Sequence, residues 1–224
     1  YPKEQRAVRD LLRRRSRLVQ QHTANVLAVQ NLFSRNRGRS LNANAIRRLT
    51  PEIVGELLPD AHLALAVQST LLAMRGQEAA IDLLEREACA QVRGRPAYRH
   101  LLSTSGIGQV LGLTILLETG PIERFARVGN YASYCRLVGS ERLSNGKRKG
   151  RGNTKSGNKY LAWAYLEAAN FAVRYNPAIK RYYQRKRAKT NGVVAIKTVA
   201  HKLARACYYM LREGTDFDVD RAFA

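Results

Sequence analysis

Apolar residues recur every three or four positions over most of the chain, and this helical period is the feature that most constrains the fold. The first such stretch covers roughly residues 3 to 34 and predicts one long amphipathic helix. A second begins after Asp60, a residue type that caps helix N-termini, and runs to about Val92. Two long helices suggest either a coiled-coil arm that pairs subunits or ordinary packing within one chain. We therefore expect a mainly α fold, with both interpretations of the long helices open.

A change in composition at residues 93–96 predicts a domain boundary. We expect residues 1–95 to form a helical linker and arm, residues 96–213 a compact helical domain, and residues 214–224 an acidic C-terminal tail in solvent. The sequence starts at Tyr1 and is helical in pattern at once. We expect it to be a fragment that another domain precedes.

The balance of charge indicates a polyanionic partner. The 224 residues include 39 Lys plus Arg against 17 Asp plus Glu, a formal net charge of +22. Such an excess repels itself and suits nucleic acid, although a merely soluble basic surface is the alternative. Asp216, Asp218 and Asp220 alternate near the end but lack the Gly and Glu that complete a calcium loop. Carboxylates are scarce elsewhere, so we expect no metal site in this chain.

The same composition bears on where the protein works. No apolar run reaches the roughly 20 residues that cross a bilayer, and no signal-peptide core is visible. Cys89, Cys135 and Cys207 are odd in number and far apart, which argues against a disulfide framework and a zinc site. We expect a cytoplasmic protein with no membrane partner.

The segment LLSTSGIGQVLGLTILL places Gly106-Ile107-Gly108 between two apolar helical stretches. This is the arrangement of a helix-hairpin-helix, in which backbone N–H groups at the start of the second helix bind a phosphate. A tight turn that serves packing alone is the alternative, because a single Gly-x-Gly is weak evidence.

Residues 136–161 form a loop rich in Gly, Asn and Ser that holds eight Lys or Arg and one Glu. Its glycines allow the backbone to approach a polyanion closely. Asn145-Gly146 predicts a two-residue β-hairpin turn, with Ser144 before it and a basic triplet after it. A second basic stripe, which includes Lys186, follows among tyrosines. The candidate nucleic-acid-binding residues are Gly106, Gly108, Arg142, Lys147, Arg148, Lys149, Arg151, Lys155, Lys159 and Lys186.

Ser144 is the candidate nucleophile. A serine hydroxyl attacks a phosphate only where neighbours stabilise the developing charge, and clustered Lys and Arg can do so. No catalytic base is visible beside it. From the residues alone Ser144 is more simply an ordinary turn serine, and Ser140 or Ser156 would be equally arbitrary choices. His201, on a helix expected from about residue 193 to 212, is isolated, and we expect a structural role for it.

Three longer blocks carry a resemblance that covers nearly the whole chain. They are LLSTSGIGQVLGLTILLETG, FARVGNYASYCRLVGSERLSNGKRKGRGNTKSGNKYLAWAYLEAANFA and KTNGVVAIKTVAHKLARACYYMLR. In these the chain resembles the DEDD-type transposases of the insertion-sequence family one-ten, and more closely its eleven-eleven subgroup. The resemblance implies an N-terminal RNase H-like nuclease domain with four metal-binding acidic residues, then a coiled-coil arm, then a helical transposase domain with a catalytic serine.

The resemblance gives residues 98–213 as the transposase domain and Ser144 as the catalytic serine. Many relatives have Ser-Gly where this chain has Ser-Asn-Gly, a departure that resembles the eleven-eleven subgroup. The implied mechanism is attack on a DNA phosphodiester to give a covalent phosphoserine link, with magnesium held by the nuclease domain of a neighbouring subunit. A structured guide RNA is an implied second partner, and a homo-oligomer, dimer or tetramer, an implied assembly.

This chain has no counterpart of the four nuclease carboxylates, so alone we expect it to be incomplete as an enzyme. Two other interpretations stay open. The first is that the chain is a non-enzymatic nucleic-acid-binding module. The second is that it is an inactive transposase remnant.

Overall fold

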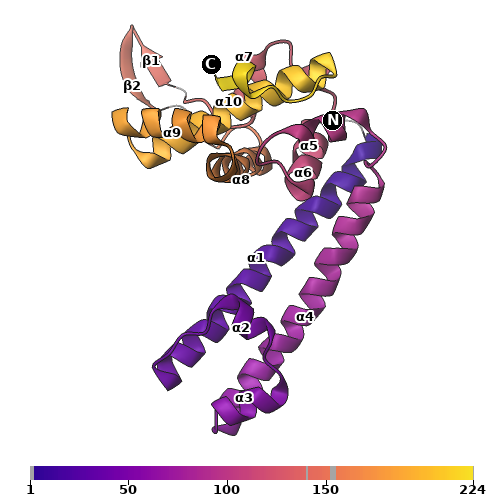
Figure 1. Cartoon of the computed structure of the whole chain (residues 1–224), viewed down its shortest axis with the longest axis vertical. Helices are drawn as coiled ribbons and strands as arrows, with labels where there is room; N and C mark the ends of the chain where they lie inside the picture. The colour runs from indigo at the N-terminus through magenta and orange to yellow at the C-terminus, as the bar shows by residue number, and fades with distance from the viewer. Residues whose placement is uncertain (1–2, 140, 152–154, 224) are drawn as a thin grey trace. The chain divides into compact units, whose positions relative to one another are not determined.

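The computed structural model describes residues 3–139, 141–151 and 155–223. Its described part is almost entirely helical, which confirms the mainly α prediction. The chain divides into two compact units, one of Asp10–Glu87 and one of Tyr1–Arg9 with Ala88–Ala224 (Figure 1). The division therefore falls inside the second long helix, a few residues before the expected change of composition.

The unit of Asp10–Glu87 is a helical hairpin. Helices α1 (Lys3–Arg37) and α4 (Ala61–Ala90) run side by side, and the short helices α2 (Ala43–Arg47) and α3 (Pro51–Leu57) connect them (Figure 1). The Asp60 carboxylate accepts hydrogen bonds from the N–H groups of His62 and Leu63 at 2.9 and 3.0 Å, which confirms it as the N-cap of α4.

Polar pairs fix the antiparallel register of this hairpin. Arg15 Nε lies 2.6 Å from a carboxylate oxygen of Glu85. Further along the same two helices, His22 Nε2 lies 3.0 Å from a carboxylate oxygen of Glu78. Within this chain, then, the two long helices pack against each other. At the far end a closed core is formed by Val26, Val29, Phe33, Ile46, Leu49, Val54, Leu58, Ala64, Val67, Leu71 and Met74.

The second unit packs its helices around α10. In chain order its elements are α5 (Pro96–Ser103), α6 (Gln109–Thr119), the 3₁₀ turn η1 (Ile122–Arg124), α7 (Val128–Tyr134), β1 (Glu141–Ser144), β2 (Lys147–Arg151), α8 (Lys159–Tyr175), α9 (Pro177–Lys189), α10 (Gly192–Glu213) and α11 (Val219–Phe223). Helix α10 touches α5, α7, α8, α9 and α11, so it is the centre of the domain.

Small residues let the central helices approach closely. Ala164 and Ala168 on α8, and Ala200 and Ala204 on α10, are completely buried. The buried hydroxyl of Tyr131 on α7 is hydrogen-bonded to that of Tyr165 on α8 at 2.7 Å. Each buried hydroxyl therefore has a hydrogen-bond partner. Burial raises the pKa of both phenols well above the ordinary value, which keeps them neutral.

The last residues differ from the solvated tail that we expected. They include α11, whose Phe223 is buried with its ring against Tyr182 at 5.3 Å between centroids. Two carboxylates of the segment have partners: Asp216 binds His100 at 2.7 Å, and Asp218 accepts from the N–H of Arg221. The apolar anchor and these partners hold the segment against the domain.

Candidate functional site

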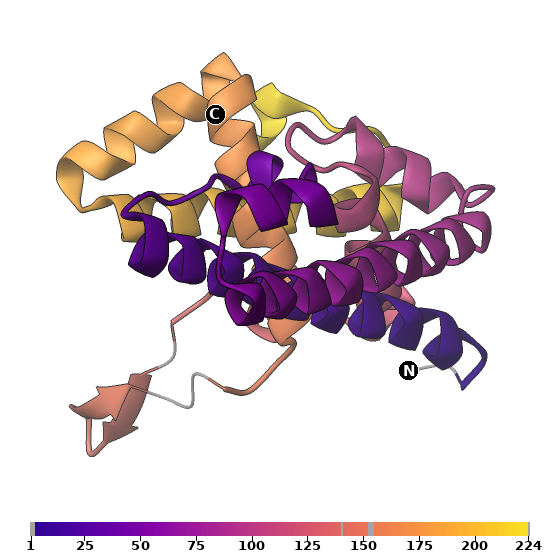
Figure 2. The same cartoon turned by 90° about the horizontal axis from the view of Figure 1, so that it is seen from below.

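The predicted β-hairpin is present. Strands β1 and β2 pair antiparallel, and the connecting residues Asn145 and Gly146 have φ values of 50° and 73°. Positive φ at both positions is the geometry of the tight turn that Asn-Gly favours, so the prediction from this dipeptide is confirmed. The hairpin stands away from the helices of its unit (Figure 2).

Ser144 is the last residue of β1, and it lies directly opposite Lys147, the first residue of β2. Opposed residues of an antiparallel pair project their side chains to the same face, with Cβ atoms about 5 Å apart. Both residues are exposed. Among the described residues no side chain is hydrogen-bonded to the Ser144 hydroxyl, so the described part of the structure leaves this hydroxyl accessible to a ligand.

The strands carry a β-bulge at the basic triplet. Leu143 pairs with Arg148 and Arg142 with Gly150, which leaves Lys149 as the extra residue of β2. A bulge twists the strand and re-aims its side chains, so Lys149 leaves the simple alternation of the hairpin. The side chains of three candidates, Arg142, Arg148 and Arg151, lie outside the described part of the structure.

Arg136, one of the eight basic residues of this loop, holds the base of the loop together. Its guanidinium donates to the carbonyl of Lys155 and, at 2.9 Å, to that of Gly157. The N–H of Asn158 donates to the carbonyl of Tyr134 at 2.6 Å. These bonds join the two ends of the loop. Arg136 therefore positions the loop through its own carbonyls.

Asn158 links this loop to the core and begins α8. Its side-chain oxygen accepts from the N–H groups of Tyr160 and Leu161, the usual work of an N-cap, and its amide donates to the buried carboxylate of Glu118 at 2.7 Å. Sequence reasoning missed Glu118. Its signal was a single acidic residue inside an apolar helix, since such a residue is rarely buried without partners.

The glycine turn lies between α5 and α6, as predicted. Gly106 has a φ of 91°, and a Cβ added there would lie 2.7 Å from the backbone nitrogen of Ala172 and closer still to the carbonyl of Ala168. The turn therefore packs directly on α8. Gly108 is the N-cap of α6 and is exposed, with open space around it. Phosphate contact by these two glycines stays a prediction.

Two exposed aromatic rings lie beside this turn and were missed by sequence reasoning. Phe171 and Tyr175 of α8 stack with centroids 6.4 Å apart and planes 7° apart, and both line a surface hollow with Gly106 and Gly108. Exposed stacked rings suit nucleobases. Their signal in the sequence was an aromatic pair four residues apart just before Pro177.

The remaining candidates are exposed but do not converge on one point. Lys155 and Lys159 lie where the loop returns to α8, and the Lys159 ammonium stands 5.2 Å from the centre of the Tyr160 ring. Lys186 lies on α9, 6.0 Å from the centre of the Tyr182 ring. The structure thus places Lys155 and Lys159 at the start of α8 and the glycine turn at its later half.

Other chemistry finds little support in the described part of the chain. There, no three His, Cys, Asp or Glu side chains gather in a way that could hold a metal ion. Cys135 and Cys207 are free and buried, and burial raises the pKa of Cys207 to about 12. Such a thiol is unreactive near neutral pH. No described helix is both long and apolar enough to cross a bilayer.

Comparison with known proteins shows that this chain is similar to a family of transposases. Residues 98–184 match the family model described as "Transposase IS116/IS110/IS902 family". A Pseudomonas aeruginosa protein named "Probable family 20 transposase" is 28% identical over 229 residues, which are 95% of this chain and 65% of the relative. A Streptomyces coelicolor protein named "Insertion element IS110 uncharacterized 43.6 kDa protein" is 27% identical over 154 residues, 68% of this chain and 37% of the relative.

These matches confirm the resemblance to IS110-type transposases that the sequence blocks indicated. The chain spans less than two thirds of the length of either relative. The matched range includes every candidate residue except Lys186.

Proposed function

We propose that this chain, a relative of the IS110-type transposases, is the part of a DNA transposase that binds DNA and carries the nucleophilic serine. The observation that carries the proposal is the position of Ser144. It lies exposed at the tip of a projecting hairpin, directly opposite Lys147 and among further Lys and Arg. A hydroxyl in this position meets a phosphodiester that the same strands attract.

The proposed step is a transesterification. The Ser144 oxygen forms a bond to phosphorus as the bond from phosphorus to one sugar oxygen breaks, and the serine proton is transferred overall to that leaving oxygen. The Lys147 ammonium stabilises the charge that develops on the non-bridging oxygens. Because the phosphoserine link keeps the energy of the broken bond, reversal of the step with another sugar hydroxyl rejoins DNA.

The arrangement along α8 supports a contact that extends over several base pairs. Lys159 begins this helix, and Gly106 packs at Ala172, about 20 Å further along at 1.5 Å per residue. Successive base pairs rise about 3.4 Å, so Lys159 and the glycine turn reach phosphates about six base pairs apart. The exposed rings of Phe171 and Tyr175 offer a surface for a base near the second contact.

Three further parts of the proposal come from the family resemblance. By that resemblance magnesium would be held by a separate nuclease domain, and no step above uses it. A structured guide RNA selects the DNA. The active form is a homo-oligomer, which is supported by the exposed leucines Leu65, Leu72 and Leu83 on the arm helix α4.

The test is a serine substitution in a full-length transposase that contains this chain. Ser144→Ala lowers DNA strand joining by at least about 1,000-fold, because the attacking oxygen is lost, while DNA affinity stays within a few-fold. Ser156→Ala, in the same loop and equally exposed, is the matched control and keeps joining activity. Strand joining by the Ser144→Ala protein at the normal rate rejects the nucleophile.

The absence of a described base beside Ser144 favours a second candidate function, a binding module without chemistry. Such a module binds DNA with the salt dependence expected of the transposase but joins no strands. Ser144→Ala then changes neither DNA affinity nor strand joining.

A further inference from the structure

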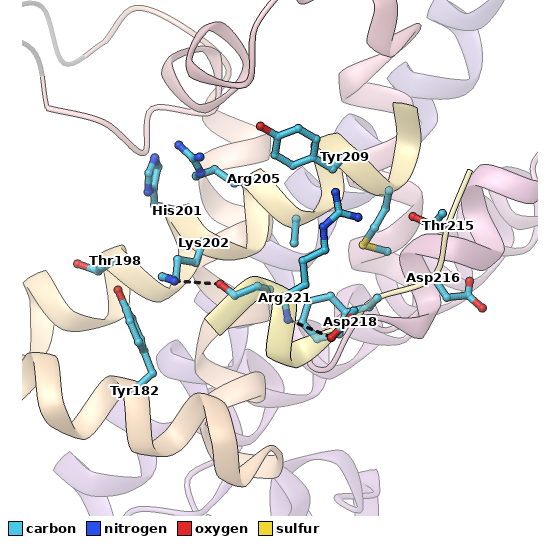
Figure 3. Close-up of a pocket in the computed structure, with 14 residues that line it drawn as sticks. Tyr182, Thr198, His201, Lys202, Arg205, Tyr209, Thr215, Asp216, Asp218 and Arg221 are labelled. Atoms are coloured by element: carbon cyan, nitrogen blue, oxygen red, sulfur yellow. Dashed lines mark hydrogen bonds between the residues drawn. The ribbon is translucent and has the colours of Figure 1, made fainter. Parts of the chain in front are cut away.

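A cavity of about 420 Å³ lies between α9, α10 and the C-terminal segment that ends in α11 (Figure 3). One wall is a face of α10 with His201, Lys202 and Arg205, and the opposite wall is formed by the segment from Thr215 to Ala222. A volume of this size holds about one nucleotide or a similar small ligand. None of the residues on the α10 wall belongs to the hairpin or the glycine turn.

The carboxylates near the cavity are already engaged. Asp216 binds the His100 ring at 2.7 Å, and Glu213 holds the guanidinium of Arg221 through two hydrogen bonds of 2.9 and 3.2 Å. Asp218 accepts from the N–H groups of Asp220 and Arg221 at the start of α11. Within the described residues, none of these carboxylates is paired with His201 or Arg205.

The basic side chains of the α10 wall lie close to one another. Lys202 Nζ donates to the carbonyl of Ala222 at 3.0 Å, and within the described residues neither His201 nor Arg205 makes a hydrogen bond or an ion pair. Burial, then Arg205 and Lys202, lower the pKa of His201 below its ordinary value. The pKa of Lys202 is also lowered, first by burial and then by the nearby charges of Arg205, Lys186 and Arg185. Arg205 therefore offers a positive charge to an anion, and a bound anion would favour the protonated form of the neighbouring His201.

The face of α10 continues with an aromatic ring. His201, Arg205 and Tyr209 are four residues apart and project from the same side of the helix (Figure 3). Tyr209 is 37% exposed, and the Arg221 guanidinium stands 5.8 Å from the centre of its ring. A histidine and an arginine followed by an aromatic ring match a phosphate followed by a sugar or a base, because the imidazole N–H and the guanidinium both donate to phosphate oxygens.

From this arrangement we propose that the cavity binds one phosphodiester of a nucleic-acid strand, with His201 and Arg205 on the phosphate and Tyr209 against the adjoining nucleoside. The inference rests on the proposed function, because it adds a nucleic-acid contact apart from the hairpin. DNA and RNA both supply a phosphodiester, and the two sources are compared in the test.

The first experiment measures binding of the 224-residue chain to labelled single-stranded DNA and to RNA of the same sequence, over a range of salt concentrations. Arg205→Gln weakens binding of the preferred strand about tenfold, as expected for a lost charge-assisted bond, and lowers the salt slope by about 0.7. Lys197→Gln removes a charge from an exposed position of the same helix outside the cavity, and its binding stays close to that of the unaltered chain.

The second experiment follows the His201 ring by NMR in the unaltered chain, so it does not depend on a variant that folds. The charged groups near this ring are Lys202 and Arg205 on its own helix, and Asp216, Asp218 and Arg221 in the C-terminal segment that lines the same cavity. Arg185 and Lys186 on α9 act on the neighbouring Lys202. A bound phosphodiester raises the pKa of His201, because it favours the protonated ring.

The outcomes separate this inference from the proposed function. If the strand binds but the pKa of His201 is unchanged at saturation and Arg205→Gln behaves as Lys197→Gln does, the cavity proposal is wrong while the hairpin proposal stands. If a mononucleotide moves the His201 signals and the strand does not, the cavity takes a free nucleotide and the proposal is again wrong. If neither nucleic acid binds at all, both proposals fail together.

Discussion

Arg136 illustrates how a basic residue of the loop is used for structure. Its φ is 57°, and its guanidinium donates to the carbonyls of Lys155 and Gly157 across the base of the loop. Lysine cannot reproduce a planar fork that reaches two carbonyls. The loop that carries Ser144 is thus held at its base by one side chain.

Replacement of this side chain lowers stability. Arg136→Gln reduces the free energy of unfolding by about 1–2 kcal/mol, since hydrogen bonds from a charged donor are lost. Arg174→Gln, an exposed change on α8, leaves it within about 0.5 kcal/mol. Urea unfolding of the two variants measures the difference, and equal midpoints contradict the clamp.

His201 gives a prediction about pH. Burial together with Arg205 and Lys202 lowers its pKa below 6.5, so the folded chain binds this proton less readily than the unfolded chain. Its contribution to stability is therefore fully present above pH 6.5 and falls as the pH decreases below that value. Arg205→Gln moves the pKa of His201 up, toward 6.5, in an NMR titration. A pKa that moves down, or does not move, contradicts the assigned cause.

At the scale of elements, the glycine turn and the hairpin differ in how they are built. The turn packs on the backbone of α8 at Gly106, whereas Gly108 has free space around it. The hairpin depends on local turn geometry at Asn145 and Gly146. A substitution in the glycine turn therefore tests how the turn packs on α8, and a substitution in the hairpin tests how the chain binds DNA.

The two glycines of the turn form a matched pair. Gly106→Ala lowers the free energy of unfolding by at least about 3 kcal/mol, because the new Cβ meets the backbone of α8 at a positive φ. Gly108 has a φ of −88° and open space around it, so Gly108→Ala lowers the free energy of unfolding by less than about 1 kcal/mol. Similar melting temperatures for the two variants refute the packing role of Gly106.

Replacing Lys147, Arg148 and Lys149 with Gln tests the hairpin as an electrostatic element. DNA binding weakens across all sequences, and the slope of log affinity against log salt becomes shallower by about 0.9 for each lost duplex phosphate contact. Anisotropy titrations at several salt concentrations give this slope. A slope equal to that of the unaltered chain removes the triplet from the DNA footprint.

At the scale of the whole molecule, the helices were predictable because their signals are local. Periodic apolar residues gave α1, and Asp60 and the Asn145-Gly146 pair marked a cap and a turn that the structure confirms. What sequence could not predict depends on residues distant in the chain. His100 meets Asp216, and Phe223 meets Tyr182, so a segment that looked like a solvated tail folds onto the domain.

The candidate site divides in the same way. The hairpin and the serine at its tip follow from a short stretch of sequence, whereas the loop clamp by Arg136 and the buried partnership of Glu118 with Asn158 depend on the folded core. His201 seemed isolated because its place in a cavity, opposite the C-terminal segment, depends on residues distant in the chain.

The central claim is that Ser144 becomes covalently linked to DNA. The most direct measurement incubates a full-length transposase containing this chain with magnesium, its RNA and labelled DNA, then isolates any protein–DNA adduct and maps the attached residue by mass spectrometry. The account predicts an adduct on Ser144 that is absent from the Ser144→Ala protein. Tight binding of DNA and RNA with no adduct, or an adduct on another residue, would contradict it.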